Sequence, residues 1–555
     1  MWVRSRRRRA AAVLTAALFG GAGAEVAEGA VSGPEPVPGV TRQAILVGNN
    51  WDGTTDIVDP RTFQRLDRVN VVPDLQQRRA EIAFRPDRLA FFYAIRTLIG
   101  EGHDQFNDDV FSSNDGTTIF VSRPSLADVV AIDLATKAIK WRAPVDGYRS
   151  DHMAISADGT RLLVSASTGN VVHILDTANG ARVGAFESGD SPHENVISKD
   201  GTRIYHASIG RVYLPVDRPK VINEAAKGGE YFQIVDARTN QVLRRIDMGK
   251  EMEEAGYPNF SSAVRPMALS PDEKFVYFQL SFFHGFVEYD LEQEKVTRIA
   301  RLPISDAAAK LLPEQYLLDS AHHGLAMDPT GTKLCVAGTM SDYGAIVDRQ
   351  TFTSRILPVG TKPYWATNSA DGKYCYISSS GDDTVAVVAY DSEQIVHKIP
   401  VGRHPQRVRN GVVSVKLYPE APAAPSTTRA GAGAGGKAGK GGSGSAAAKR
   451  RALKLRATTA KGALRFTRGD ERVACRAANG RKIVRCRVEL RAGKRLLASG
   501  ERVVKAAPQL GVQVRLTQAG RALRRSRSVR AKLTARATDA AGRTATTART
   551  VTIRR

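Results

Sequence analysis

Short runs of apolar residues separated by polar turns cover most of the chain, and the same pattern returns about every 40–45 residues. The most regular part of each repeat is a turn containing Asp, usually followed by Gly, between two strands of alternating apolar and polar residues. Because Gly tolerates a positive φ and Asp caps its own turn, this step predicts a β-hairpin. The turn occurs at Ser113–Gly116, Ser156–Gly159, Ser198–Gly201, Ser270–Glu273, Asp328–Gly331 and Ser369–Gly372.

Each repeat is predicted to hold four strands, one before the hairpin turn and three after it. Residues 161–165, 171–176 and 182–186 are examples of the second, third and fourth strand. Four short strands per repeat are typical of a β-propeller blade. Residues 45–71 supply three strands without a first one, and residues 405–415 supply a first strand with nothing after it. Joined, they make a seventh blade that closes the ring and leaves no open sheet edge.

The blade ends carry a family resemblance. Val-Gly-x-x-Pro steps stand at Val359–Pro363 and Val401–Pro405, and Ser369–Tyr374 holds the turn between them. These residues resemble the YVTN-type propeller repeat, and the resemblance covers about residues 43–415, although the second strand reads Cys-Tyr-Ile-Ser at 375–378. It implies a seven-bladed propeller, which we place at residues 43–417. It implies no single activity, because this fold hosts binding proteins, cell-surface proteins, lactonases and redox enzymes.

Three insertions interrupt the repeats, at residues 73–105, 205–231 and 303–320. The first is predicted to be helical. Its apolar residues at helical spacing are Leu89, Phe92, Ile95 and Leu98. Excursions of this kind usually cap one face of a disc or shape a pocket.

The N-terminus predicts export. Within residues 1–24, Arg4 and Arg6–Arg9 form a cationic segment, residues 10–19 are apolar, and Ala22–Ala24 is a small-residue cleavage site. An uncleaved anchor is the alternative, and the sequence does not decide between general and twin-arginine export. No later segment offers about 18 consecutive apolar residues, so we expect a protein that is not integral to a membrane. The expected location is periplasmic, cell-wall-associated or extracellular.

The C-terminal part differs sharply in composition. Residues 420–451 are rich in Ala, Gly, Pro, Ser and Lys and predict a flexible linker. Residues 453–555 alternate apolar and basic residues in short strands. Residues 537–543 followed by 551–553 resemble the last hairpin of bacterial immunoglobulin-like surface domains, which implies a small β-sandwich. The expected fold class is therefore all-β: a seven-bladed propeller, a linker and an immunoglobulin-like domain.

Most of the chain's net charge of +25 lies in this C-terminal part. From residue 418 onward there are about 34 Lys and Arg against about 6 Asp and Glu. A basic face of this kind binds polyanions, and export favours acidic cell-wall polymers or anionic lipid headgroups over nucleic acid as the partner. The alternative is a solvated basic surface that reflects an Arg-rich composition.

The four cysteines fall into two pairs. Cys475 and Cys486 flank the sequence Asn479–Lys482, which predicts a hairpin turn, and facing positions on a hairpin are close enough for a disulfide. Cys335 and Cys375 lie in strands of neighbouring repeats, at offsets that differ by one residue. We therefore expect them to point to opposite faces and to be buried thiols.

Candidate chemistry lies where the first strand of each repeat begins. First strands line the central channel of a propeller, so their initial residues ring one mouth of it. Four of the seven repeats place a histidine there, although the chain has only 10 histidines. The residues at these positions are Asp108, Asp109, Asp151, His152, His193, Glu194, Arg265, His322, His323, Tyr364, Trp365, His404 and Arg407.

Several interpretations of this ring remain open. As a metal site it would hold a divalent ion, because His is a common ligand of Zn, Cu and Fe. The candidate metal ligands are His152, His193, His322 and His323. As an enzyme it would use acid–base catalysis on a lactone, sugar acid or peptide beside the arginines, as propeller lactonases and lyases do at this face. The candidate catalytic residues are His152, His193 and His323.

Ligand binding without chemistry is a third interpretation, and hydrogen bonding between blades is a fourth. The candidate ligand-binding residues are Asp108, Glu194, Arg265, Tyr364, Trp365, His404 and Arg407. The function we expect is an exported propeller that binds a small molecule, a peptide or an envelope partner at this face and is tethered by its basic domain. The alternative is a lactonase-like hydrolase or lyase, or a metal-dependent enzyme. The sequence has no phosphate loop and no HExxH, Gly-x-Ser-x-Gly or CxxCH motif.

Overall fold

The chain divides into two units, residues 1–426 and 427–555. In the first, the computed structural model describes residues 34–212, 226–316 and 320–420; in the second, it describes 455–459, 463–465, 470–477, 482–492, 495–507, 509–517, 529–539 and 544–554. The predicted export signal at 1–24 and nearly all of the predicted linker at 420–451 lie outside the described residues. Among the described residues, no helix is both long enough and apolar enough to cross a membrane.

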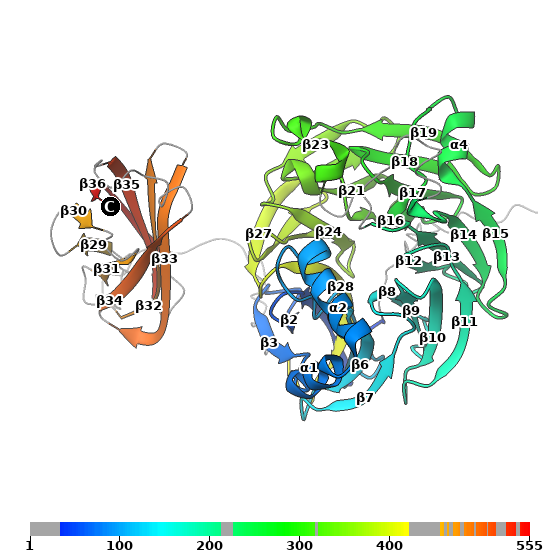
Figure 1. Cartoon of the computed structure of the whole chain (residues 1–555), viewed down its shortest axis with the longest axis horizontal. Helices are drawn as coiled ribbons and strands as arrows, with labels where there is room; N and C mark the ends of the chain where they lie inside the picture. The colour runs from blue at the N-terminus through cyan, green and yellow to red at the C-terminus, as the bar shows by residue number, and fades with distance from the viewer. Residues whose placement is uncertain are drawn as a thin grey trace, which may run out of the picture. The chain divides into compact units, whose positions relative to one another are not determined.

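The first unit is a ring of seven four-stranded antiparallel sheets, as the sequence predicts (Figure 1). The first four sheets, with strands in hydrogen-bonded order, are β28 (Pro405–Ser414), β1 (Thr41–Asn49), β2 (Thr54–Val58) and β3 (Arg65–Asn70); β4 (Asp109–Ser112), β5 (Thr118–Arg123), β6 (Asp128–Asp133) and β7 (Ile139–Pro144); β8 (Ser150–Ile155), β9 (Arg161–Ala166), β10 (Val171–Asp176) and β11 (Arg182–Glu187); and β12 (Pro192–Ile197), β13 (Arg203–Ser208), β14 (Phe232–Asp236) and β15 (Val242–Ile246).

The other three sheets complete the disc. They are β16 (Val264–Leu269), β17 (Phe275–Leu280), β18 (Gly285–Asp290) and β19 (Lys295–Arg301); β20 (Leu325–Met327), β21 (Lys333–Gly338), β22 (Tyr343–Asp348) and β23 (Ser354–Leu357); and β24 (Pro363–Asn368), β25 (Tyr374–Ser379), β26 (Thr384–Ala389) and β27 (Gln394–Pro400). The first strands contact one another in a closed circle, β28–β4–β8–β12–β16–β20–β24–β28. The seven-bladed propeller is therefore confirmed.

The two ends of the propeller sequence close the ring. Strand β28 pairs antiparallel with β1, from Thr41 opposite Ser414 to Asn49 opposite Pro405. The hairpin turn before β5 packs on this closure. Its Gly116 has φ +65°, and a Cβ there would lie 2.5 Å from the Ser414 backbone nitrogen. The Asp-Gly turn is thus required both by backbone conformation and by space.

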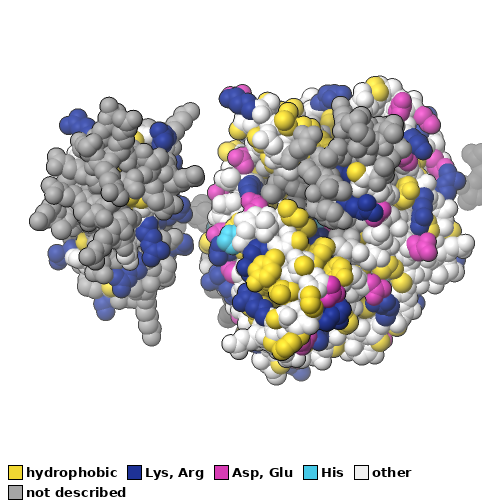
Figure 2. All heavy atoms as spheres, in the orientation of Figure 1, with side chains coloured by type: hydrophobic (Ala, Val, Ile, Leu, Met, Phe, Trp, Pro, Cys, Tyr) yellow, Lys and Arg dark blue, Asp and Glu magenta, His cyan; other side chains and the backbone are white. Residues whose placement is uncertain are grey.

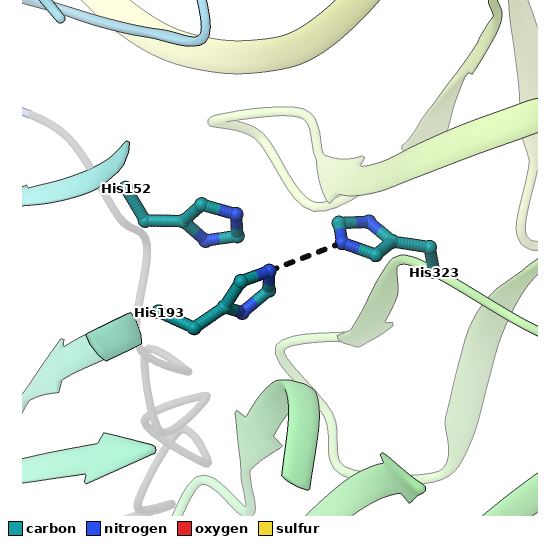
Figure 3. A group of neighbouring side chains, drawn as sticks. All are labelled: His152, His193 and His323. Carbon is teal, nitrogen blue, oxygen red and sulfur yellow. Dashed lines mark hydrogen bonds between the residues drawn. The ribbon is translucent and has the colours of Figure 1, made fainter. Parts of the chain in front are cut away.

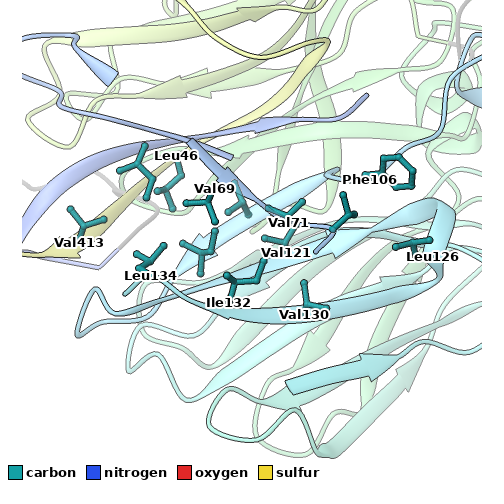
Figure 4. Packing of buried hydrophobic residues seen from close by; sticks show 14 of the residues in the cluster. Leu46, Val69, Val71, Phe106, Val121, Leu126, Val130, Ile132, Leu134 and Val413 are labelled. Atoms are coloured by element: carbon teal, nitrogen blue, oxygen red, sulfur yellow. The ribbon is translucent and has the colours of Figure 1, made fainter. Parts of the chain in front are cut away.

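Burial follows the order of the strands in each sheet. All ten residues of β28 are buried, whereas the outermost strand β27 alternates exposed and partly buried positions. Apolar side chains from neighbouring sheets interdigitate between the blades. Figure 4 shows one such layer between the ring-closing blade and the next, where Leu46, Val69 and Val121 pack together. These layers hold the blades face to face, which fixes the inner strands around the axis.

The insertion at 73–105 is helical, as predicted. Between β3 and β4 it forms α1 (Leu75–Ala83), α2 (Pro86–Ala94) and a π-helical turn at Ile95–Ile99, and Figure 1 shows the helices on one face of the disc. The π-helical turn shifts the side-chain spacing, so Ile99 is buried and Leu98 is 61% exposed. Phe84, Tyr93 and Leu98 leave an apolar patch on this surface (Figure 2).

The other excursions are smaller. The insertion at 205–231 connects β13 to β14, and the segment at 303–320 contains short 3₁₀ turns at Ala308–Lys310 and Pro313–Gln315. Helix α4 (Met248–Glu254), which the sequence analysis did not predict, joins β15 to β16. Asp247 caps it by accepting a hydrogen bond from the backbone nitrogen of Lys250.

The second unit is a small β-domain. Its strands, in chain order, are β29 (Leu455–Thr459), β30 (Ala463–Arg465), β31 (Asp470–Ala477), β32 (Ile483–Ala492), β33 (Arg495–Ala507), β34 (Gln509–Leu516), β35 (Val529–Asp539) and β36 (Thr544–Arg554). They form one sheet in the order β29-β31-β34-β33-β32-β35-β36-β30, which curls so that β29 also contacts β36. Alternate residues, such as Val488 and Leu533, fill a single apolar core.

The prediction that Cys335 and Cys375 are free thiols is wrong, because they form a disulfide with Cα atoms 6.5 Å apart. They lie on β21 and β25, the second strands of adjacent blades. When two sheets stack, the surfaces in contact are the upper face of one sheet and the lower face of the other. Residues with opposite orientations in neighbouring blades therefore face each other. The opposite orientation that argued against a bond therefore produces one, within a shared apolar cluster.

Cys475 and Cys486 also form a disulfide, but the expected hairpin between them is wrong. Strand β31 pairs with β29 and β34, whereas β32 pairs with β33 and β35. Because the sheet curls, the two strands face each other across the apolar core, where both cysteines are buried. The bond therefore crosses the core of the domain.

Candidate metal centre

Most of the residues at the beginning of the first strands are buried in the interior of the disc, because the first strands form a closed circle. Five of these strands contain a β-bulge at this point. The bulged segments are Asp151–His152 on β8, His193–Glu194 on β12, Arg265–Pro266 on β16, Tyr364 on β24 and Gln406–Arg407 on β28. A bulge adds a residue to one strand and re-aims its side chain, so consecutive residues can both turn into the interior.

Three histidines from three blades converge (Figure 3). One ring nitrogen of each of His152, His193 and His323 lies within 4.8 Å of the others, and all three residues are buried. The rings of His152 and His193 are 3.8 Å apart between centroids, and Nε2 of His193 lies 3.4 Å from Nε2 of His323. His323 precedes β20, where Gly324 allows close approach to β24: a Cβ at Gly324 would lie 2.7 Å from Cα of Trp365.

Neighbouring groups fix the tautomers of two of these rings. Nε2 of His152 accepts a hydrogen bond from Arg407, which can only donate, so the proton of the neutral ring is on Nδ1 and points to Glu194. Nδ1 of His323 donates to the carbonyl oxygen of Tyr364 at 3.2 Å. Both rings therefore carry a lone pair on Nε2, and metal-binding histidines are typically oriented in this way. Nδ1 of His193 has no hydrogen-bond partner among the described residues.

Burial and the surrounding cations keep the histidines neutral. Burial lowers the pKa values of His152, His193 and His323 well below their usual range, and nearby positive charges lower them further. The same burial raises the pKa of Asp108 to about 7 and that of Glu194 to about 8. Neutral imidazoles are donors for a metal ion.

Charged residues of both signs surround the histidines. Four buried arginines and four buried carboxylates lie in this cluster, namely Arg149, Arg265, Arg407 and Arg409 with Asp108, Asp109, Asp151 and Glu194. Arg409 donates two hydrogen bonds to Asp109, at 2.9 and 2.7 Å, and Arg149 is paired with Asp151. These ion pairs compensate part of the positive charge of the buried cluster.

Aromatic side chains form one wall of the cluster. The guanidinium of Arg407 lies 4.4 Å from the ring centroid of Trp365 and 5.6 Å from that of Tyr364. The ring of His323 stacks on Tyr364 at 4.2 Å. Arg407 also approaches Asp108 at 3.4 Å. The predicted ligand-binding residues Asp108, Glu194, Tyr364, Trp365 and Arg407 are thus next to the histidines.

Two predicted residues lie in other environments. His322 turns away from its neighbour His323: its Nε2 lies 3.0 Å from the hydroxyl of Tyr343, and its ring lies 5.5 Å from that of His284. His404 stacks on Trp51 at 3.9 Å and has a left-handed backbone with φ +54°. Of the four predicted metal ligands, the structure therefore brings three together.

Sequence analysis did not single out Arg149 and Arg409. A signal was present for Arg409, which lies two residues from Arg407 on β28, because residues two apart share a face of a regular strand. Arg149 directly precedes β8, where alternation gives no such signal. Arg265, which was predicted, donates a hydrogen bond to Ser281 at 2.9 Å and helps to lower the pKa values of His193 and His323.

These observations define a seven-bladed β-propeller with a buried three-histidine cluster on its axis. No protein-family model matches the chain, and no curated protein matches it. Among solved structures it is similar to Kuenenia stuttgartiensis hydrazine synthase, with 17% identity over 66% of this chain and 97% of that chain and a TM-score of 0.44. The propeller is established by the strand pairing of this chain, and the function is inferred below from its residues alone.

Proposed function

We propose that the protein is an exported, YVTN-type propeller that binds a divalent transition-metal ion through His152, His193 and His323. One observation carries the proposal: three neutral imidazoles from different blades converge, and neighbouring groups leave the lone pair of two of them on Nε2. Three histidines are a common ligand set for Zn²⁺ and copper, with a further position left for water or substrate.

The alternative of acid–base catalysis by the histidines alone has less support. A general base works best when its pKa lies near the working pH. Burial instead lowers the pKa values of all three rings well below their usual range. Such weak bases favour metal ligation over proton transfer at neutral pH.

Metal titration tests the proposal. After removal of metal with a chelator, the wild-type protein is expected to bind one equivalent of Zn²⁺ or Co²⁺. His193→Ala should weaken binding by about 100-fold or more, because loss of even an outer-shell partner costs about 10–100-fold. The triple variant His152→Ala/His193→Ala/His323→Ala should not bind. The matched control is His322→Ala, which removes a buried histidine outside the cluster and should leave affinity unchanged. Full binding by the triple variant would contradict the proposal.

We further propose that the basic C-terminal domain, of immunoglobulin-like type, tethers the protein to an envelope polyanion. On the exposed side of the sheet, Arg487 lies opposite Arg536 and Arg491 lies opposite Lys532. Like charges at directly opposite positions destabilise a sheet. Such an arrangement becomes favourable when a polyanion lies along the strands.

Deletion of residues 453–555 is expected to release the protein from the envelope fraction into the soluble fraction. The full-length variant Arg487→Gln/Arg491→Gln/Lys532→Gln/Arg536→Gln should also be released, because it removes the charge and keeps the domain. Its stability should change little, because removal of the like-charge pairs offsets the loss of the exposed ion pairs that Arg487 and Arg491 make with Glu489. Quantitative immunoblotting of the two fractions provides the measurement, and unchanged fractionation of both variants would refute tethering.

A further inference from the structure

Arg407 is buried without enough partners for its donors. Its side chain is 0% exposed, yet among the described residues its Nε and Nη1 atoms have no hydrogen-bond partner. Its contacts are made by Nη2, to Nε2 of His152 and, at 3.4 Å, to Asp108. A buried donor without a partner costs free energy, and more so when it is charged. The residue is therefore suited to a partner that the chain itself does not supply.

The neighbouring Arg409 and Arg149 are better satisfied: among the described residues, Arg149 lacks a hydrogen-bond partner only at Nε. Arg409 donates two hydrogen bonds to Asp109, and Arg149 donates one to Asp151. Trp365 and Tyr364 cover the guanidinium of Arg407. Neither ring accepts a hydrogen bond from Nε or Nη1 of Arg407. The donors of Arg407 that lack a partner thus lie beside the histidines and next to aromatic side chains.

A metal ion and Arg407 compete for the same lone pair. The ion proposed above would bind Nε2 of His152, which at present accepts a hydrogen bond from Arg407. Arg407 must then release this nitrogen, and its positive charge would remain close to a dication. An anion between the two removes the repulsion and supplies acceptors for the guanidinium.

We propose that the centre takes a small carboxylate as its ligand, bound to the metal ion on one side and to Arg407 on the other. This inference rests on the proposed metal site. A planar carboxylate matches the forked donors of a guanidinium, and the rings of Trp365 and Tyr364 suit the organic part of a small acid. The histidines hold the metal ion, and Arg407 selects the anion.

Titration of the Co²⁺-loaded full-length protein with acetate tests this inference. The visible spectrum of the ion is expected to change saturably with acetate, because the anion enters its coordination sphere. Arg407→Gln should weaken acetate binding by about 10–100-fold, the range for a lost hydrogen bond to a charged group, while Co²⁺ itself binds at least as tightly as in wild type. Arg407→Lys, which keeps the charge and loses the fork, should fall between the two. The control Arg61→Gln removes an exposed arginine of the same blade and should bind acetate like wild type.

The outcomes separate the two proposals. Binding of Co²⁺ with no response to acetate would overturn the carboxylate inference and leave the metal site standing. An equal response to phosphate and acetate, or unchanged acetate affinity in Arg407→Gln, would also overturn it. Failure of the wild-type protein to take up Co²⁺ or Zn²⁺ would instead refute the metal site on which it rests.

Discussion

Replacing Asp128 with Asn is expected to lower the free energy of unfolding of the propeller by about 3–5 kcal/mol, the range for breaking a buried ion pair. Asp128 is 0% exposed and accepts hydrogen bonds from Arg123 at 2.7 and 2.9 Å. It also pairs with Arg78 of α1 at 3.2 Å. In the variant, Arg123 keeps only its pair with Asp74, and Arg78 keeps only its pair with the partly exposed Glu81. The two buried guanidinium groups therefore have too little negative charge around them.

Denaturant unfolding followed by tryptophan fluorescence measures this change, because Trp51, Trp141 and Trp365 lie in the propeller and the C-terminal domain has no tryptophan. Asp87→Asn is the matched control. Its pair with Arg85 is exposed on the same insertion, and exposed pairs contribute about 0–1 kcal/mol. Equal effects of the two substitutions would show that Asp128 does not hold the insertion to the blade in the way described.

Removing the disulfide between adjacent blades with Cys335→Ala/Cys375→Ala is expected to destabilise the propeller by about 4 kcal/mol. The bond closes a loop between residues 40 apart in sequence. A cross-link of this length restricts the unfolded chain by about 4 kcal/mol in the loop-entropy account. Both positions lie in the apolar cluster, so alanine introduces no unpaired polar group there.

The same fluorescence experiment measures this loss. Cys475→Ala/Cys486→Ala is its internal control, because that bond lies in the other domain and should leave the fluorescence transition of the propeller unchanged. The disulfide assignment would be contradicted if the unfolded propeller contained two reactive thiols without prior reduction. An unfolding transition left unchanged by Cys335→Ala/Cys375→Ala would contradict it as well.

The two disulfides depend on how sheets and strands are arranged in space, which the alternation of residues along a strand does not determine. Alternation along β21 and β25 indicated correctly that Cys335 and Cys375 take opposite orientations within their blades. Whether this opposite orientation keeps the two cysteines apart or brings them together depends on how one blade stacks on the next. In the C-terminal domain, the spacing of Cys475 and Cys486 in the sequence suggested a hairpin. The strand order in the curled sheet instead places the two cysteines opposite each other across the core.

The candidate metal centre likewise depends on tertiary structure, at the level of individual side chains. The repeat identified the ring of residues, and three of its four candidate ligands converge. It could not exclude His322, because His322 and His323 both precede β20 and no strand alternation fixes their orientation there. The two residues are adjacent, and only their contacts show which one joins the cluster: Nε2 of His323 lies 3.4 Å from Nε2 of His193, whereas Nε2 of His322 lies 3.0 Å from the hydroxyl of Tyr343.

The sequence by itself determined the number of blades, the closure of the ring by both ends and the level at which polar residues gather. These depend on local chemistry: turns that need Asp and Gly, strands that alternate, and a first strand that is missing at one end and present at the other. Only the tertiary structure decided which side chains meet. Seven strands distant in sequence come together when the ring closes, and bulges and blade stacking then direct each side chain toward the axis or between the blades.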